Sequence, residues 1–127
     1  MRVSAAIFKC GDSVLLMRRA SNQPLAGMWE YPGGKFESGE DGVVCLRREL
    51  SEELGIDAKI GALITIAKHK TDSGKEIELY AYDVLGYTGE IQLRVHDDMH
   101  WVKVSELLLH PQLPADLLVS MALINKK

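Results

Sequence analysis

The segment that most constrains this chain is residues 34–56, GKFESGEDGVVCLRRELSEELGI. At about 100° per residue, a helix over its second half brings Glu49, Glu52 and Glu53 within an arc of roughly 100°. An apolar stripe occupies the neighbouring arc: Val43, Leu46, Leu50 and Leu54. Like charges at this spacing repel each other. The segment therefore predicts an amphipathic helix that docks on a core and presents three carboxylates to a divalent cation.

Length and charge limit the class of protein. The chain has 127 residues, which predicts a single domain over 1–127. Its net charge of -3, from 15 basic and 18 acidic residues, argues against stable binding to long nucleic acid. Cys10 and Cys45 are interpreted as reduced thiols, most simply two small core residues. Without a leader or an apolar run of 18 residues, we expect a cytoplasmic protein with no membrane partner.

Apolar periodicity and turn residues predict the order of the elements. Two paired strands, 2–9 and 13–18, are joined by a turn. A helix follows from residue 38 or 39 to Gly55, which suits a left-handed C-terminal position. The remaining predicted elements are strands at 58–70, 75–84, 90–94 and 99–104, a helical turn at 105–109 and a helix at 115–124. This order indicates an α+β fold in which helices cover a mixed sheet, an α/β/α sandwich.

The spacing of the fixed residues carries a family resemblance. Starting at Gly34, the pattern G-x5-E-x7-R-E-L-x-E-E-x-G-I resembles the Nudix box at every defined position. From residue frequencies, a chance match at one start point is on the order of 10⁻⁹. Residues 29–35, WEYPGGK, resemble the approach to this box in the MutT-like branch. Residues 3–123 are similar to the bacterial CTP and 8-oxo-dGTP pyrophosphohydrolases of the Nudix hydrolase family.

The resemblance implies a fold, a cofactor and a set of ligands. It implies the Nudix-type sandwich and hydrolysis of a nucleoside diphosphate linked to another group, with Mg²⁺ or Mn²⁺, ions that prefer hard oxygen ligands. By match, Glu52 and Glu53 are metal ligands, Glu49 is a ligand or the base that activates water, and the Gly33 carbonyl completes the shell. Arg48 then orients a glutamate by a charge-assisted hydrogen bond. The alternative, a solvated acidic helix face, does not explain the whole box in register.

Four residues outside the acidic face match substrate-binding positions, each with a structural alternative. Arg19 matches a phosphate-contacting arginine, or is a surface arginine. Lys35 is placed to touch phosphate or a carboxylate, and Lys70 lies where cytidine-type relatives carry a basic residue. Asp116 matches the residue that reads the base, or caps a helix. The aromatic residues Phe8, Trp29 and Tyr31 either include a stacking partner for a base or fill the core.

One position departs from the family pattern. Relatives carry a glutamate, a distal metal ligand or base, where this chain has Val95. Asp97 or Asp98 takes that role from a loop, or both are solvent-facing turn residues and the role is absent. The identity of the general base stays open. Glu40, about 180° from Glu49 on a helical wheel, is interpreted as a structural salt bridge or cap at least as readily as a metal ligand.

The function that these expectations favour is Mg²⁺-dependent hydrolysis of a nucleoside triphosphate to the monophosphate and pyrophosphate. The expected substrates are CTP-type or oxidised guanine nucleotides, and the expected state is a monomer or homodimer. Two alternatives remain. One is a Nudix hydrolase of ADP-ribose, a dinucleotide or RNA 5′ ends, and the other is a nucleotide-binding sensor without turnover.

Overall fold

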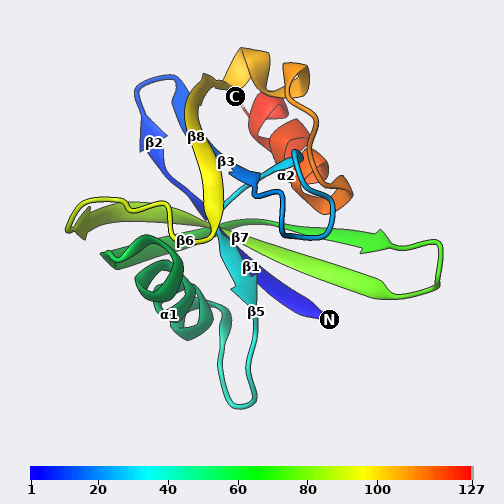
Figure 1. The fold of residues 1–127 in the computed structure, drawn as a ribbon, viewed down its shortest axis with the longest axis horizontal. Helices are drawn as coiled ribbons and strands as arrows, with labels where there is room; N and C mark the ends of the chain where they lie inside the picture. The colour runs from blue at the N-terminus through cyan, green and yellow to red at the C-terminus, as the bar shows by residue number, and fades with distance from the viewer. Residues whose placement is uncertain (127) are drawn as a thin grey trace.

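The computed structural model describes residues 1–126 and is organised around a four-stranded mixed sheet (Figure 1). The strand order is β5-β1-β7-β6. Its strands are β1 (Arg2–Ile7), β5 (Gly33–Lys35), β6 (Asp57–Lys70) and β7 (Glu76–Thr88). β1 is parallel to β7 and antiparallel to β5, while β6 and β7 form a long antiparallel hairpin. A turn at residues 71–74 closes that hairpin, where the Thr71 N–H donates to the Lys75 carbonyl.

A second sheet is built around β3 (Ser13–Arg19). β8 (His96–Lys103) runs antiparallel along all of β3, and the short strands β2 (Lys9–Cys10) and β4 (Trp29–Glu30) pair with its two ends. A 3₁₀ helix, η1 (Val104–Leu109), follows β8. This sheet matters for the site because it sets Arg19, Glu30 and His96 on neighbouring strands.

Two helices cover opposite faces of the central sheet, α1 (Gly42–Leu54) and α2 (Pro114–Asn125) (Figure 1). Alternate residues of β1 serve the two sides. Ala5 and Ile7 lie in the core cluster under α2, and Ala6 and Phe8 lie in the cluster under α1. Because side chains on both faces of this strand are buried, its sequence is apolar at most positions instead of alternating between apolar and polar residues. The predicted α+β sandwich with a mixed sheet is confirmed.

One predicted strand pairing and one predicted strand were wrong. Residues 2–9 do not form a hairpin with 13–18, because β1 leaves for the central sheet and only Lys9–Cys10 pairs with β3. Residues 90–94 form no strand. Instead, the Gln92 N–H donates to the Leu54 carbonyl and Arg94 Nη1 donates to the Ser51 carbonyl, so this segment satisfies carbonyls at the C-terminus of α1.

Two composition-based expectations are also tested by the fold. Cys45 is a buried core residue, whereas Cys10 is exposed on β2, so the interpretation of both as core residues was wrong for Cys10. Neither α1 nor α2, nor any other helix within residues 1–126, has the length and apolar character needed to cross a membrane.

Candidate active site

The helix that carries the acidic face begins and ends at local signals. The Asp41 carboxylate accepts from the Val44 N–H at 2.9 Å as the N-cap, and Gly55 has the left-handed φ of 70° that was predicted for it. The predicted start at residue 38 or 39 was early by about one turn. There the Glu40 carboxylate accepts from the Glu37 N–H at 2.8 Å, which closes a turn before the helix begins.

The buried face of α1 determines where its glutamates point. Leu46, Leu50 and Leu54 are fully buried against the central sheet, as the apolar stripe predicted. Val43 was wrongly included, since its side chain is 37% exposed and Cys45 occupies the buried position. With these side chains inside, Glu49 and Glu53 lie on the side of the helix that faces β5.

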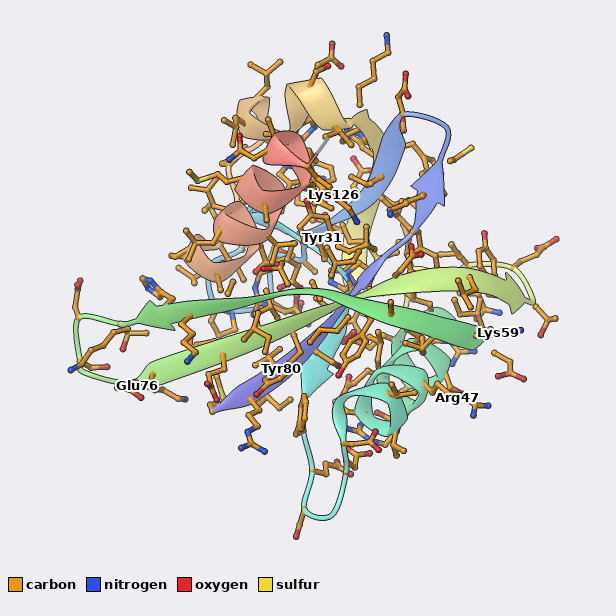
Figure 2. The ribbon with its side chains drawn as sticks, turned by 180° about the vertical axis from the view of Figure 1, so that it is seen from behind. Tyr31, Arg47, Lys59, Glu76, Tyr80 and Lys126 are labelled. Carbon is orange, nitrogen blue, oxygen red and sulfur yellow. The ribbon has the colours of Figure 1, made fainter. Side chains whose placement is uncertain are left out.

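A cavity of about 500 Å³ connects this acidic face with α2. Polar residues that line it include Arg19, Glu30, Gly34, Glu49, Glu53 and Asp116. Its apolar wall includes Val3, Ile77 and Leu79 from the central sheet and Leu113 before α2. Tyr31, which also lines it, lies beside α2 in Figure 2. One end of the cavity is therefore acidic, and the other is apolar with a single buried acid, Asp116.

Arg48 ties the acidic end together. Its Nε donates to Glu40 at 2.7 Å, and its Nη1 donates to Glu49 at 2.8 Å and to Glu52 at 3.2 Å. Nη2 also reaches the Lys35 carbonyl at 3.1 Å. The predicted orientation of a glutamate by Arg48 is present in this geometry. Glu40 lies before the helix, so the wheel angle used for it was wrong, although the salt bridge predicted for it is present.

The acidic face fits a hard divalent cation by its chemistry. Glu53 Oε1 is buried and has no hydrogen-bond partner within residues 1–126. Burial, followed by the Glu49 carboxylate, raises the pKa of Glu53 to about 8. Among the described residues, no three acidic, histidine or cysteine side chains converge on one point, and Arg48 forms ion pairs with Glu49 and Glu52. A cation would satisfy the orphaned oxygen and reverse the repulsion between the carboxylates.

Substitution of Arg48 tests whether it orients the glutamates, and the adjacent Arg47 provides a matched control. Arg48→Ala is expected to lower kcat/KM or the affinity for Mg²⁺ by about 10–100-fold, because the glutamates lose the group that orients them. Arg48→Lys keeps the charge but not the fork of donors, so we expect an intermediate loss. Arg47→Ala is the control: Arg47 is exposed on α1 and pairs with Asp57, and we expect less than a twofold change. Steady-state kinetics with a magnesium titration measure all three, and equal losses in Arg47→Ala and Arg48→Ala would contradict the assignment.

Asp116 is a buried acid rather than a helix cap. Leu113 is the N-cap residue of α2, so the capping alternative was wrong. Asp116 is 6% exposed, and its Oδ2 accepts from the Tyr31 N–H at 3.0 Å. Burial, followed by the Glu30 carboxylate, raises the pKa of Asp116 to about 8. The Tyr31 hydroxyl and Ser120 Oγ lie 2.6 Å apart, which fixes the tyrosine ring beside Asp116.

The raised pKa of Asp116 gives a stability prediction. Its folded pKa of about 8 lies above the usual value near 3.9, so the folded protein binds the extra proton and loses stability as pH rises between these values. Asp116→Asn stays neutral and keeps an acceptor for Tyr31. We expect its unfolding free energy to exceed that of the wild type by on the order of 1–3 kcal/mol at pH 9, and by less at pH 5. Urea unfolding at pH 5, 7 and 9 in EDTA measures this, with the exposed Asp57→Asn as control; no gain at pH 9 would contradict it.

The structure places the other predicted substrate residues differently. Arg19 and Lys35 line the cavity. Lys70 does not: its neighbours His69 and Thr71 line the cavity, because alternate residues of a strand point to opposite faces. The role predicted for Lys70 therefore has no support in this geometry.

Asp97 and Asp98 lie on β8 rather than in a loop, and neither lines the cavity. Arg18 Nε donates to Asp97 at 2.7 Å, and Asp98 lies 3.3 Å from His100. Their substitution for the acid missing at Val95 is therefore not supported, which agrees with the solvent-facing alternative.

Sequence reasoning missed Glu30 and His96 as site residues. Glu30 lines the cavity and contacts both Arg19 and the buried His96. The sequence offers one weak signal, the position of Glu30 within residues 29–35, the predicted approach to the box. The pairing itself depends on the register of β3 with β4 and β8.

Comparisons of the sequence with known proteins identify a family and several relatives. The NUDIX domain family matches residues 1–122. The chain is 38% identical to a CTP pyrophosphohydrolase of Escherichia coli over 118 residues, 92% of this chain and 86% of that protein. It is 31% identical to an 8-oxo-dGTP diphosphatase of Haemophilus influenzae over 113 residues, 89% of this chain and 82% of that protein.

Solved structures give the same result for the fold. The solution structure of the Escherichia coli ORF135 protein is similar with a TM-score of 0.85 and 36% identity, covering 95% of this chain and 86% of that one. The crystal structure of a MutT NUDIX hydrolase from Burkholderia pseudomallei has a TM-score of 0.83 at 25% identity, covering 95% of both chains.

Proposed function

Because this chain belongs to the Nudix hydrolase family, we propose that it hydrolyses nucleoside triphosphates to nucleoside monophosphates and pyrophosphate. The preferred substrates are cytosine nucleotides or 8-oxo-dGTP, the compounds named for two of its relatives. One observation carries the proposal: a single cavity has the acidic face of α1 at one end and the buried Asp116 at the other. A nucleotide that fills it places its phosphates and its base at chemically different ends.

At the phosphate end, Glu49, Glu52, Glu53 and the Gly33 carbonyl would hold Mg²⁺, or Mn²⁺ in its place. When bound, the cation offsets charge on the phosphates and makes a water more nucleophilic. Water attacks a phosphorus of the triphosphate chain, the bond between the α and β phosphates breaks, and pyrophosphate leaves. Glu49 serves as a ligand or accepts the proton from water, while Arg48 keeps its carboxylate oriented.

At the base end, Asp116 and Tyr31 face the nucleobase. The Asp116 carboxyl is held by the Tyr31 N–H, and the tyrosine ring is fixed through Ser120. A buried polar group of this kind discriminates between hydrogen-bonding edges, because a mismatched base leaves it without a partner. Arg19 and Lys35 also line the cavity, and they are the basic groups that would contact the phosphates.

A kinetic screen tests the proposal. Purified protein with Mg²⁺ is incubated with CTP, dCTP, 5-methyl-dCTP, 8-oxo-dGTP, dATP and ADP-ribose, and pyrophosphate and monophosphate are quantified. We expect kcat/KM for a cytosine nucleotide or for 8-oxo-dGTP to exceed that for dATP by about 10-fold or more. Binding without product would instead support a sensor, and preference for ADP-ribose would support another Nudix activity. The proposal includes action in the cytoplasm as a monomer or homodimer, which cell fractionation and light scattering measure.

A further inference from the structure

Three side chains from three strands form a connected row at the edge of the cavity. Arg19 Nη1 donates to Glu30 Oε1 at 3.0 Å, and Glu30 Oε2 lies 2.8 Å from His96 Nε2. β3 carries Arg19, β4 carries Glu30 and β8 carries His96, with Arg19 and His96 paired in the strand register. Secondary structure thus holds the backbones of all three residues in place.

Burial of the side chains increases along this row from Arg19 to His96. The side chain of Arg19 is 20% exposed, that of Glu30 17% and that of His96 only 1%. The inner end is therefore fixed in the protein, while the outer end reaches the cavity, which Arg19 and Glu30 both line. A charge-assisted hydrogen bond from a buried partner restricts the rotamers of Glu30, and Glu30 in turn restricts Arg19.

The guanidinium of Arg19 has a second anchor and a free side. Its Nε donates to the Pro24 carbonyl at 2.7 Å. Within residues 1–126, its Nη2 donates no hydrogen bond to the protein, so this nitrogen is available to a ligand. A guanidinium held on two sides presents its remaining donors in one direction, which suits a planar or bidentate contact with a phosphate.

Both oxygens of Glu30 are already engaged, which bears on what it does. Arg19 takes one oxygen and His96 takes the other, so a cation would have to compete with two donors for this carboxylate. Glu30 also lines the cavity together with Glu53 and Asp116, so its negative charge adds to theirs. This repulsion is a local cost, and the contacts with Arg19 and His96 are the feature that offsets it.

We propose that Glu30, held by His96, is a positioning residue that aims Arg19 at the phosphate chain of the substrate. This rests on the proposed nucleotide hydrolysis. This chain has Val95 where its relatives carry a distal glutamate. The proposal nevertheless gives the nearby acid Glu30 a role other than metal binding. Arg19 contacts the substrate directly, and Glu30 and His96 act through it.

Substitution of Glu30 separates positioning from metal binding. Glu30→Ala is expected to raise KM by about 10-fold or more with kcat within about threefold, because Arg19 loses its orientation. Glu30→Gln keeps an oxygen for Arg19 and offers an amide N–H to the other tautomer of His96, so KM is expected within about threefold of the wild type. The magnesium concentration for half-maximal activity stays unchanged in both variants. Thermal unfolding confirms that each variant is folded.

A double-mutant cycle tests whether Glu30 acts through Arg19. Arg19→Ala raises KM about as much as Glu30→Ala, and the double variant is no worse than Arg19→Ala alone. Arg47→Ala, Asp57→Ala and their double variant are the matched control, an exposed arginine–carboxylate pair outside the cavity. Their KM stays at the wild-type value. Figure 2 shows Arg47 on α1, away from Tyr31 and α2.

Three results would overturn the inference. A rise of about 10-fold in the magnesium requirement of Glu30→Gln makes Glu30 a metal ligand. Additive effects in the Arg19 and Glu30 cycle make the two residues independent, and an unchanged KM in Glu30→Ala removes the role. If the wild type releases no pyrophosphate, the proposed function fails instead. In that case the dissociation constant of a non-hydrolysable nucleoside α,β-methylene triphosphate is measured for the wild type, Arg19→Ala, Glu30→Ala and the double variant. Additive losses of affinity would again contradict the inference.

Discussion

Glu53→Gln is expected to reduce the release of pyrophosphate by about 1000-fold or more while leaving the fold intact. A loss of this size corresponds to ~4 kcal/mol of transition-state stabilisation, a reasonable share for a ligand of a catalytic cation. The buried Glu53 Oε1, which has no partner in residues 1–126, is the oxygen that a cation would satisfy. Glutamine keeps the shape but is a much poorer metal ligand. Steady-state kinetics with a magnesium titration measure the effect.

Stability measurements separate loss of the metal site from loss of the fold in this variant. Because burial opposes the charge on Glu53, a neutral glutamine is expected to leave the metal-free protein at least as stable as the wild type at pH 8. Magnesium then raises the melting temperature of the wild type and not of the variant. Glu78→Gln, a surface carboxylate that pairs with Arg2 and Lys68, is the control. Full activity in Glu53→Gln would refute the metal role.

Gly33→Ala is expected to cost ~3 kcal/mol or more of stability and to reduce kcat/KM by about 100-fold. A Cβ on Gly33 would overlap the carbonyl oxygen of Ser4 on the paired strand β1. That oxygen belongs to the backbone, so no side chain can turn aside to make room. The strand β5 has to move away from β1, and the Gly33 carbonyl moves with it. Urea unfolding and kinetics measure both effects.

Gly86→Ala is the matched control for this prediction. Gly86 lies on β7, and a Cβ there meets nothing within 4 Å. Alanine also restricts the unfolded chain more than glycine does, so its stability is expected to match or slightly exceed that of the wild type. If the unfolding free energies of Gly33→Ala and Gly86→Ala differ by less than about 1 kcal/mol, roughly the scatter of surface substitutions, close packing of β5 on β1 is not what requires glycine.

Local sequence signals predicted most of the secondary structure. Gly55 ended α1 as expected, since a glycine is suited to its φ of 70°. One failure concerned the partner of a strand, and the other concerned a segment that was predicted as a strand and is not one. The segment 2–9 is extended over most of its length, yet β1 pairs with β5 and β7, far away in the sequence. Residues 90–94 bind the end of α1, an arrangement that depends on where that helix lies.

The site residues also fall into those that local sequence predicts and those that depend on tertiary structure. Arg48 and its glutamates were anticipated because they belong to one short segment with a recognisable spacing. Lys70 failed by one position on a strand, where neighbouring residues face opposite sides. Glu30 was missed because its partner His96 lies 66 residues away and is brought close only by the sheet around β3.

By itself, the sequence determined the family, the acidic helix and the glycines beside it. Helix geometry is regular, so the spacing of Glu49, Glu52 and Glu53 is enough to place them on one face of the helix. Only the tertiary structure decided that one cavity joins this face to Asp116, and that Glu30 connects Arg19 to a buried histidine. The physical reason is that strand register is a long-range property. It follows from how both faces of the sheets are buried, and no short stretch of residues contains it.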